Sequence, residues 1–159
     1  MTLAIGGWNE GSQNYSIMAR DPDKRKLFAA SALNFIRRYN FDGLDLDWEY
    51  PGKRGGVKED KENFILLIKD LYKVFRPQNL MLTAAIGASA ATIDAAYDIP
   101  EMYKYLDYVH VMCYDYHGES LVFDQMEILE SVLSRIFELF EYSNSFSRIL
   151  LFVFVFVPL

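Results

Sequence analysis

The stretch FDGLDLDWEYP, residues 41–51, combines the pattern of an apolar strand with a high density of carboxyl groups. Side chains alternate between the two faces of a β-strand. One face would therefore carry the apolar residues Leu44, Leu46 and Trp48. The other face would carry the acids Asp45, Asp47 and Glu49. Neighbouring carboxylates repel one another and lower β propensity, so this face needs a function that offsets its cost to folding.

The segments around this stretch predict an α/β protein. Short apolar segments typical of strands occur at 2–5, 41–49, 80–86 and 108–114. Apolar residues recur at helical spacing over 21–38, 60–75, 90–97 and 100–106, and the polar segment 9–20 is expected to be a loop. Strands that alternate with amphipathic helices favour a parallel sheet covered on at least one side. Chemistry in such sheets gathers at the carboxyl ends of the strands, where Glu49 and Asp115 are expected.

Composition disfavours several kinds of partner. The 159 residues carry a formal net charge of −6 and offer no basic stripe for a nucleic acid or an anionic membrane. Cys113 is the only cysteine, so no intrachain disulfide is possible, and its apolar neighbours favour a buried thiol. The N-terminus lacks the basic region of a signal peptide, and the apolar segment 149–159 is shorter than the roughly 20 residues that span a bilayer.

The acidic face allows three interpretations. Carboxylates suit magnesium or calcium, but a calcium loop counted from Asp45 places Tyr50 where glycine is required. A solvated acidic edge is disfavoured because the neighbouring strands are apolar on both faces. Acid catalysis is favoured, because crowded carboxyls cannot all ionise cheaply and at least one pKa should rise. Trp48 and Tyr50 offer flat surfaces for sugar rings, which favours two-carboxylate hydrolysis of a glycoside.

Four motifs in order along the chain resemble those of glycoside hydrolase family 18, the chitinases and related proteins. The stretch 41–51 follows the pattern D-G-x-D-x-D-x-E. AIGGW at 4–8 resembles the S-x-G-G motif of the third barrel strand, with Ala4 in the usual serine position. LMLTAAI at 80–86 resembles the fifth strand, and MCYDYHG at 112–118 resembles the M-x-Y-D motif of the sixth. The resemblance covers roughly residues 2–118 and is closest to animal and arthropod chitinases.

This resemblance implies a TIM barrel and retaining hydrolysis of β-1,4-linked N-acetylglucosamine polymers, assisted by the acetamido group of the substrate. It assigns Glu49 as the general acid and later the base. Asp47 would orient the acetamide N–H, and Asp45 would hold Asp47 and share a proton with it. Tyr114 would donate to the acetamido carbonyl. The remaining positions would bind substrate or shape the entry to the strand: Asp115, Trp8, Tyr50 and Asp42. His110 and His117 are expected to be structural.

Only part of the family pattern is present. A complete (β/α)8 barrel takes about 250 residues, whereas the segments found here resemble its third to sixth strands. We therefore expect a partial TIM (β/α)8 barrel over 1–118 with unpaired outer strands, and a divergent tail over 119–159. The tail shows a helical apolar stripe and then the apolar run at 149–159, which would promote aggregation if exposed. The abrupt change near residue 119 indicates a truncated gene model or translation into intron sequence.

Two alternatives to an active hydrolase stay open. One is a chitin-binding lectin on the same fold, although relatives of that kind commonly lack the acid that is present here as Glu49. The other is a non-functional truncated product. The expected partner is chitin or a chito-oligosaccharide, with no cofactor, no metal ion, no nucleic acid and no membrane partner. The resemblance implies an extracellular location, and the sequence indicates no oligomeric state.

Overall fold

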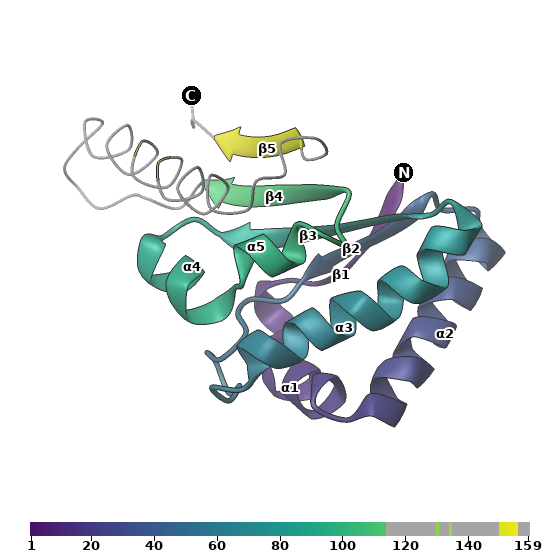
Figure 1. Cartoon of the computed structure of the whole chain (residues 1–159), viewed down its shortest axis with the longest axis horizontal. Helices are drawn as coiled ribbons and strands as arrows, with labels where there is room; N and C mark the ends of the chain where they lie inside the picture. The colour runs from purple at the N-terminus through teal and green to yellow at the C-terminus, as the bar shows by residue number, and fades with distance from the viewer. Residues whose placement is uncertain (114–129, 131–133, 135–149, 156–159) are drawn as a thin grey trace.

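A five-stranded parallel sheet forms the frame of the molecule (Figure 1). The computed structural model describes residues 1–113, 130, 134 and 150–155. The strands follow the order β1 (Thr2–Gly6), β2 (Gly43–Asp47), β3 (Met81–Gly87), β4 (Tyr108–Cys113) and β5 (Leu150–Val155). Each strand pairs in parallel with the next strand in the chain. This order is the one that successive strand–helix units produce in a barrel wall.

The helices connect these strands along one face of the sheet (Figure 1). The α-helices are α1 (Gln13–Ala19), α2 (Pro22–Tyr39), α3 (Asp60–Phe75), α4 (Ala90–Ala96) and α5 (Ile99–Met102). Short 3₁₀ turns precede α1, as η1 (Trp8–Glu10), and follow α3, as η2 (Arg76–Gln78). No helix in the described part of the chain is long and apolar enough to cross a membrane.

The core lies between the sheet and these helices. Leu44, Leu46 and Trp48 of the opening stretch are all buried there, as their alternation predicts. The Trp48 indole stacks on Tyr15 of α1 at a centroid distance of 5.1 Å and meets the ring edge of Phe64 in α3 at 5.5 Å. Aromatic pairs of this geometry add to the burial of apolar area. One face of β2 is therefore fixed by packing, which leaves the other face for the acids.

Local capping explains where α2 begins and ends. The Asp21 carboxylate accepts hydrogen bonds from the backbone N–H groups of Asp23 and Lys24, and Pro22 occupies the first turn. The helix ends at Asn40, which adopts a left-handed conformation with φ of 57°. The helix predicted over 21–38 is therefore confirmed, and it extends to Tyr39.

Three expectations about the elements need correction. Segment 9–20 is not a loop, because it contains η1 and α1. β1 is not a buried strand, because it lies at one edge of the sheet and its residues are half-buried or exposed. β4 is not an unpaired outer strand, because β5, from the apolar run near the C-terminus, pairs along it. The helical stripe expected before that run lies outside the described residues.

Candidate active site

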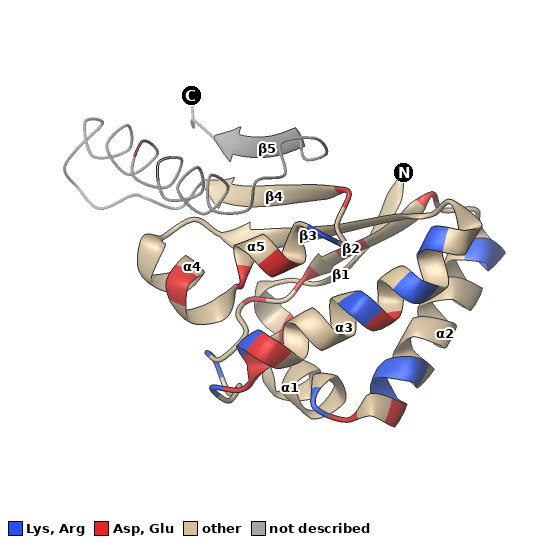
Figure 2. Cartoon of the chain, viewed as in Figure 1, with Lys and Arg blue, Asp and Glu red and all other residues tan. Residues whose placement is uncertain are grey.

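The acids of β2 lie on the face of the sheet opposite the helices. We call this the acid face and define it by Asp45, Asp47 and Glu49 together with the side chains beside them on the neighbouring strands. Strand pairing places small residues there, with Ala4 beside Asp45, Gly6 beside Asp47, and Thr83 on the other side of Asp45. Figure 2 shows acidic segments within the sheet, whereas Lys and Arg lie mostly on α2 and α3. Small neighbours leave room for carboxyl groups and for a ligand above them.

Gly6 and Gly7 allow close approach of backbone to β2. A Cβ atom on Gly6 would lie 2.1 Å from the Asp47 carbonyl oxygen, and its φ of 117° is one that glycine alone adopts readily. Gly7 N–H donates to the same carbonyl oxygen at 2.8 Å. The pair therefore brings the backbone of β1 into close contact with the backbone at Asp47.

Asp45 is the most firmly held of the acids. Its side chain is 12% exposed, and its Oδ1 atom accepts a short hydrogen bond from Thr83 Oγ1 on β3. His110 Nδ1 on β4 lies 3.4 Å from the same oxygen. Two side chains from two further strands thus converge on one carboxylate.

Asp47 is the acid whose protonation is perturbed. Burial, and then the charges of Glu49 and Asp45, raise its pKa to about 6. Within the described part of the chain, its Oδ1 atom is buried and has no hydrogen-bond partner. The prediction that crowding raises at least one pKa is therefore confirmed, with burial as the larger cause. A polar atom in this position can accept a hydrogen bond from a bound ligand.

Glu49 follows β2 at the carboxyl end of the sheet and is 8% exposed. The residues on both sides of it are held through Ser12, at the N-terminus of α1. Ser12 Oγ accepts from Trp48 Nε1 at 2.9 Å and donates to the Tyr50 carbonyl oxygen at 2.8 Å. Arg54 Nη1 donates to the Glu49 carbonyl oxygen at 3.1 Å. The segment that carries the acid is thus held by the Trp48 side chain and by the backbone carbonyl groups of Glu49 and Tyr50.

The buried carboxylate of Asp60 supports the segment that carries Glu49. Asp60, at the start of α3, is completely buried and accepts from Ser16 Oγ and Val57 N, both at 2.7 Å. It also accepts from Gly52 N at 3.3 Å. These contacts join α1, α3 and the loop after β2 into one unit. Sequence reasoning missed both Ser12 and Asp60 as supporting residues, because their partners lie far away in the chain.

Comparison with known proteins identifies the family of the chain that carries these residues. The model of the glycosyl hydrolases family 18 matches residues 1–137. The chain belongs to this family. The Drosophila melanogaster protein named probable chitinase 2 is 57% identical over 118 residues, which are 74% of this chain and 24% of that protein. The chain thus spans about a quarter of the length of this relative.

Solved structures of chitinases match the fold. The Group IV chitinase of Ostrinia furnacalis superposes with a TM-score of 0.82 at 34% identity, over 94% of this chain and 45% of that one. A mutant of catalytic domain 2 of the Group II chitinase of Ostrinia furnacalis, solved with penta-N-acetylchitooctaose, gives 0.81 at 28% identity, over 94% and 44%. These matches confirm the predicted partial (β/α)8 barrel.

The other predicted site residues have different outcomes. Trp8 is 59% exposed, and the Arg54 guanidinium lies over its ring at 3.5 Å. Tyr50 is half-buried beside Gly87, near Glu49. Asp42 directly precedes β2, at the entry to the strand, and lies at the opposite end of that strand from Glu49. Tyr114, Asp115 and His117 lie outside the described residues.

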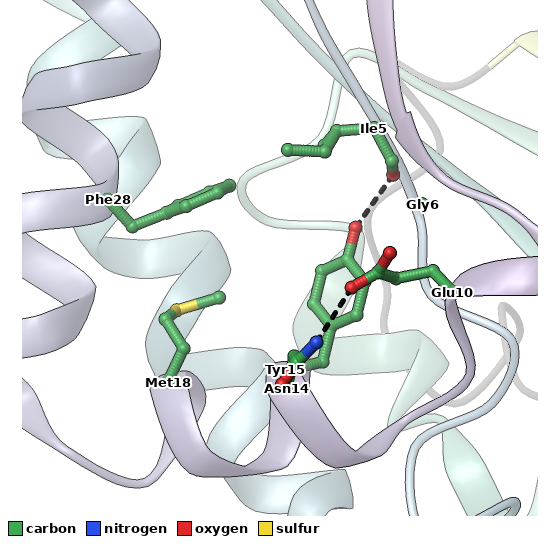
Figure 3. A pocket seen from close by; sticks show the side chains of 7 residues that line it. All are labelled: Ile5, Gly6, Glu10, Asn14, Tyr15, Met18 and Phe28. Carbon is green, nitrogen blue, oxygen red and sulfur yellow. Dashed lines mark hydrogen bonds between the residues drawn. The ribbon is translucent and has the colours of Figure 1, made fainter.

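A separate pocket of about 260 Å³ lies beside β1 on the helix side (Figure 3). It is lined by Ile5, Gly6, Glu10, Asn14, Tyr15, Met18 and Phe28. Tyr15 Oη donates to the Ile5 carbonyl oxygen at 2.8 Å, and Asn14 Nδ2 donates to Glu10 Oε1 at 3.1 Å. None of Asp45, Asp47 and Glu49 lines this pocket. Among the described residues, no group of three or more His, Cys, Asp and Glu is arranged to hold a metal ion.

Proposed function

We propose that this chain carries the catalytic strand of a chitinase-type hydrolase that cleaves β-1,4-linked N-acetylglucosamine polymers. The observation that carries the proposal is the acid face, on which Asp47, with its pKa raised to about 6, lies between Asp45 and Glu49. Family 18 membership supports the reaction class. The substrate class is supported by the Group II chitinase domain of Ostrinia furnacalis that was solved with penta-N-acetylchitooctaose.

Glu49 is the proposed acid and base. It protonates the glycosidic oxygen while the carbonyl oxygen of the substrate's acetamido group attacks the anomeric carbon and the glycosidic bond breaks. A water molecule then attacks the same carbon from the face that the leaving group vacated, and its proton passes to the Glu49 carboxylate. Two displacements at one carbon retain its configuration. The low exposure of Glu49 suits this role, because a dry site strengthens each electrostatic interaction.

Asp47 and Asp45 prepare the substrate in this scheme. Asp47 Oδ1, which has no partner in the described part of the chain, accepts from the acetamide N–H and aims its carbonyl oxygen at the anomeric carbon. Asp45 shares a proton with Asp47 across the same face. Tyr114 and Asp115, which follow β4 directly in the chain, are proposed to contact the acetamido carbonyl and the neighbouring sugar. Trp8 and Tyr50 are proposed as surfaces for sugar rings. An extracellular site of action is proposed from family membership alone.

The stereochemistry of the first product tests this proposal. The 159-residue chain is incubated with a soluble chitin oligomer, and proton NMR follows the anomeric signals before mutarotation. Initial release of the β-anomer is expected. Initial release of the α-anomer would contradict the retaining scheme. A parallel pull-down on chitin separates the lectin alternative, which predicts binding without turnover, and absence of both would favour the non-functional product.

A further inference from the structure

Arg54 joins the segment that follows β1 to the segment that follows β2. Its guanidinium lies over the indole of Trp8, with Cζ 3.5 Å from the ring centroid. Its Nη1 atom donates to the Glu49 carbonyl oxygen at 3.1 Å, and its own carbonyl oxygen accepts from Ser12 N–H at 3.2 Å. Three contacts of one residue therefore connect the two segments beyond the carboxyl ends of β1 and β2.

The backbone at Arg54 adopts a conformation that arginine rarely takes. Its φ is 51°, in the left-handed region that favours glycine and, among other residues, asparagine. The other non-glycine residues with positive φ in the described part of the chain are Asn40 and Asn79. A backbone held in this region by an arginine carries an energetic cost, so we looked for the benefit in the contacts of its side chain.

The main benefit lies at the Trp8 ring. Trp8 is 59% exposed, so burial alone does not hold its indole in one orientation. A guanidinium over an indole is attracted to the π-system of the ring and covers that face. A sugar ring can then stack only on the opposite face. An aromatic side chain that is ordered before a ligand arrives also spares the ligand the cost of ordering it.

We infer that Arg54 is a positioning residue that fixes the Trp8 indole before substrate arrives and leaves one face of the ring for a sugar unit of a chito-oligosaccharide. Because the same guanidinium donates to the Glu49 carbonyl oxygen, the sugar surface is set relative to the segment that carries the acid. The use of Trp8 by a sugar rests on the proposed function. The hold of Arg54 on Trp8 does not, because it can be measured without a sugar.

Acrylamide quenching of tryptophan fluorescence measures this hold in the ligand-free 159-residue chain. Trp8 and Trp48 are the two tryptophans, and Trp48 has no exposed surface, so the quenchable emission reports Trp8. Arg54→Asn removes the guanidinium and introduces a residue type that this chain already holds at positive φ, and it is expected to raise the quenching constant. Arg54→Lys keeps the charge without the planar group and is expected to act in the same direction, which keeps the test decisive if one variant fails to fold.

Arg38→Gln is the matched control. Arg38 is exposed on α2, and its guanidinium lies over Tyr39 instead of a tryptophan, with Cζ 5.6 Å from the ring centroid. The substitution removes the same charge as Arg54→Asn at a distance from the acid face. It is expected to leave the quenching constant unchanged.

Binding of hexa-N-acetylchitohexaose tests the consequence for the sugar. Every variant carries Glu49→Gln so that the probe is not consumed, and calorimetric titration measures Kd. Arg54→Asn is expected to raise Kd by about two- to tenfold, the range for ordering one side chain on binding, whereas Arg38→Gln leaves Kd unchanged. In a Trp8→Ala background, Arg54→Asn is expected to have no further effect on Kd, a result that general loss of structure does not produce.

Three results would count against the inference. Quenching constants of Arg54→Asn and Arg54→Lys that equal that of Arg38→Gln would overturn the hold on Trp8. An effect of Arg54→Asn on Kd that persists in full when Trp8 is alanine would overturn its action through the indole. If the chain with Glu49→Gln does not bind the hexamer, the use of Trp8 by a sugar fails together with the proposed function, and the quenching constants still decide whether Arg54 holds the ring.

Discussion

Replacing Ser12 by alanine tests how the acid-bearing segment is held. The Ser12 hydroxyl is completely buried and serves two groups, the Trp48 indole N–H at 2.9 Å and the Tyr50 carbonyl oxygen at 2.8 Å. It makes no capping bond to the backbone of α1, so loss of a helix cap does not contribute. Ser12→Ala leaves the indole N–H, whose residue has no exposed surface, without a partner inside the core.

The expected cost follows from the two orphaned groups. Leaving a buried donor or acceptor without a partner costs about 1–3 kcal/mol. The Tyr50 carbonyl is only part-buried and can regain a water molecule, so its share is at the low end. The two together predict a loss of about 2–4 kcal/mol from the free energy of unfolding. For a domain with a total stability of about 5–15 kcal/mol, this loss is large.

Urea unfolding followed by far-ultraviolet circular dichroism and by Trp fluorescence measures this loss. Ser31→Ala is the matched control, because Ser31 is exposed on α2 and the same atoms are removed. It is expected to change stability by no more than about 0.5 kcal/mol. If Ser12→Ala costs no more than Ser31→Ala, Ser12 does not hold the segment around Glu49, and the account of its positioning fails.

Three further substitutions probe the acid face and its surroundings. The pKa of Asp47, raised to about 6 from 3.8, means that the folded protein holds this proton more tightly than the unfolded chain, so its contribution to stability is lost as pH rises from about 4 to above 6. Asp47→Asn should therefore be more stable than the unaltered protein at pH 8 and should lose that advantage at pH 4. The expected advantage is about 1 kcal/mol, because the half-exposed Asp47 carboxyl is partly screened by solvent. Urea unfolding at both pH values checks this. A Cβ atom on Gly43 would lie 2.2 Å from the Met81 carbonyl oxygen, so Gly43→Ala should separate β2 from β3 and cost more than about 3 kcal/mol in thermal or urea unfolding. A Cβ atom on Gly87 would lie 2.9 Å from Thr92 Cγ2 and 3.0 Å from Tyr50 Cε1, so Gly87→Ala should displace both side chains and weaken retention on chitin, with a stability loss of about 1–3 kcal/mol. Retention equal to that of the unaltered protein would contradict the placement of Tyr50 in the site.

Local rules predicted the division of β2 into two faces. Alternation requires only neighbouring residues, so the apolar and acidic sets could be separated before any contact was known. The start of α2 was equally predictable, because Asp21 and Pro22 act within one turn. Helix α1 was missed because its buried side includes Ser16, a polar residue whose partner is Asp60, 44 positions away. A seven-residue helix that buries one polar residue beside Tyr15 and Ala19 gives little apolar periodicity to detect.

The surroundings of the acids could not be predicted for the same reason. Thr83 and His110 reach Asp45 only because β3 and β4 pair in one particular register. His110 was expected to be structural, and nothing near it in the sequence indicates a carboxylate partner. The apolar run near the C-terminus showed high β propensity, but pairing of β5 with β4 depends on a long-range contact that propensity does not specify.

Hydrolysis of a chitin oligomer by Glu49→Gln tests the central claim most directly. The substitution keeps the size of the side chain and removes the proton that Glu49 is proposed to donate. Glu62→Gln is the control, because it makes the same chemical change at an exposed position on α3. The account predicts that Glu49→Gln lowers kcat by a factor of about 10²–10⁴, whereas Glu62→Gln leaves it unchanged. Equal turnover by Glu49→Gln and Glu62→Gln would contradict it.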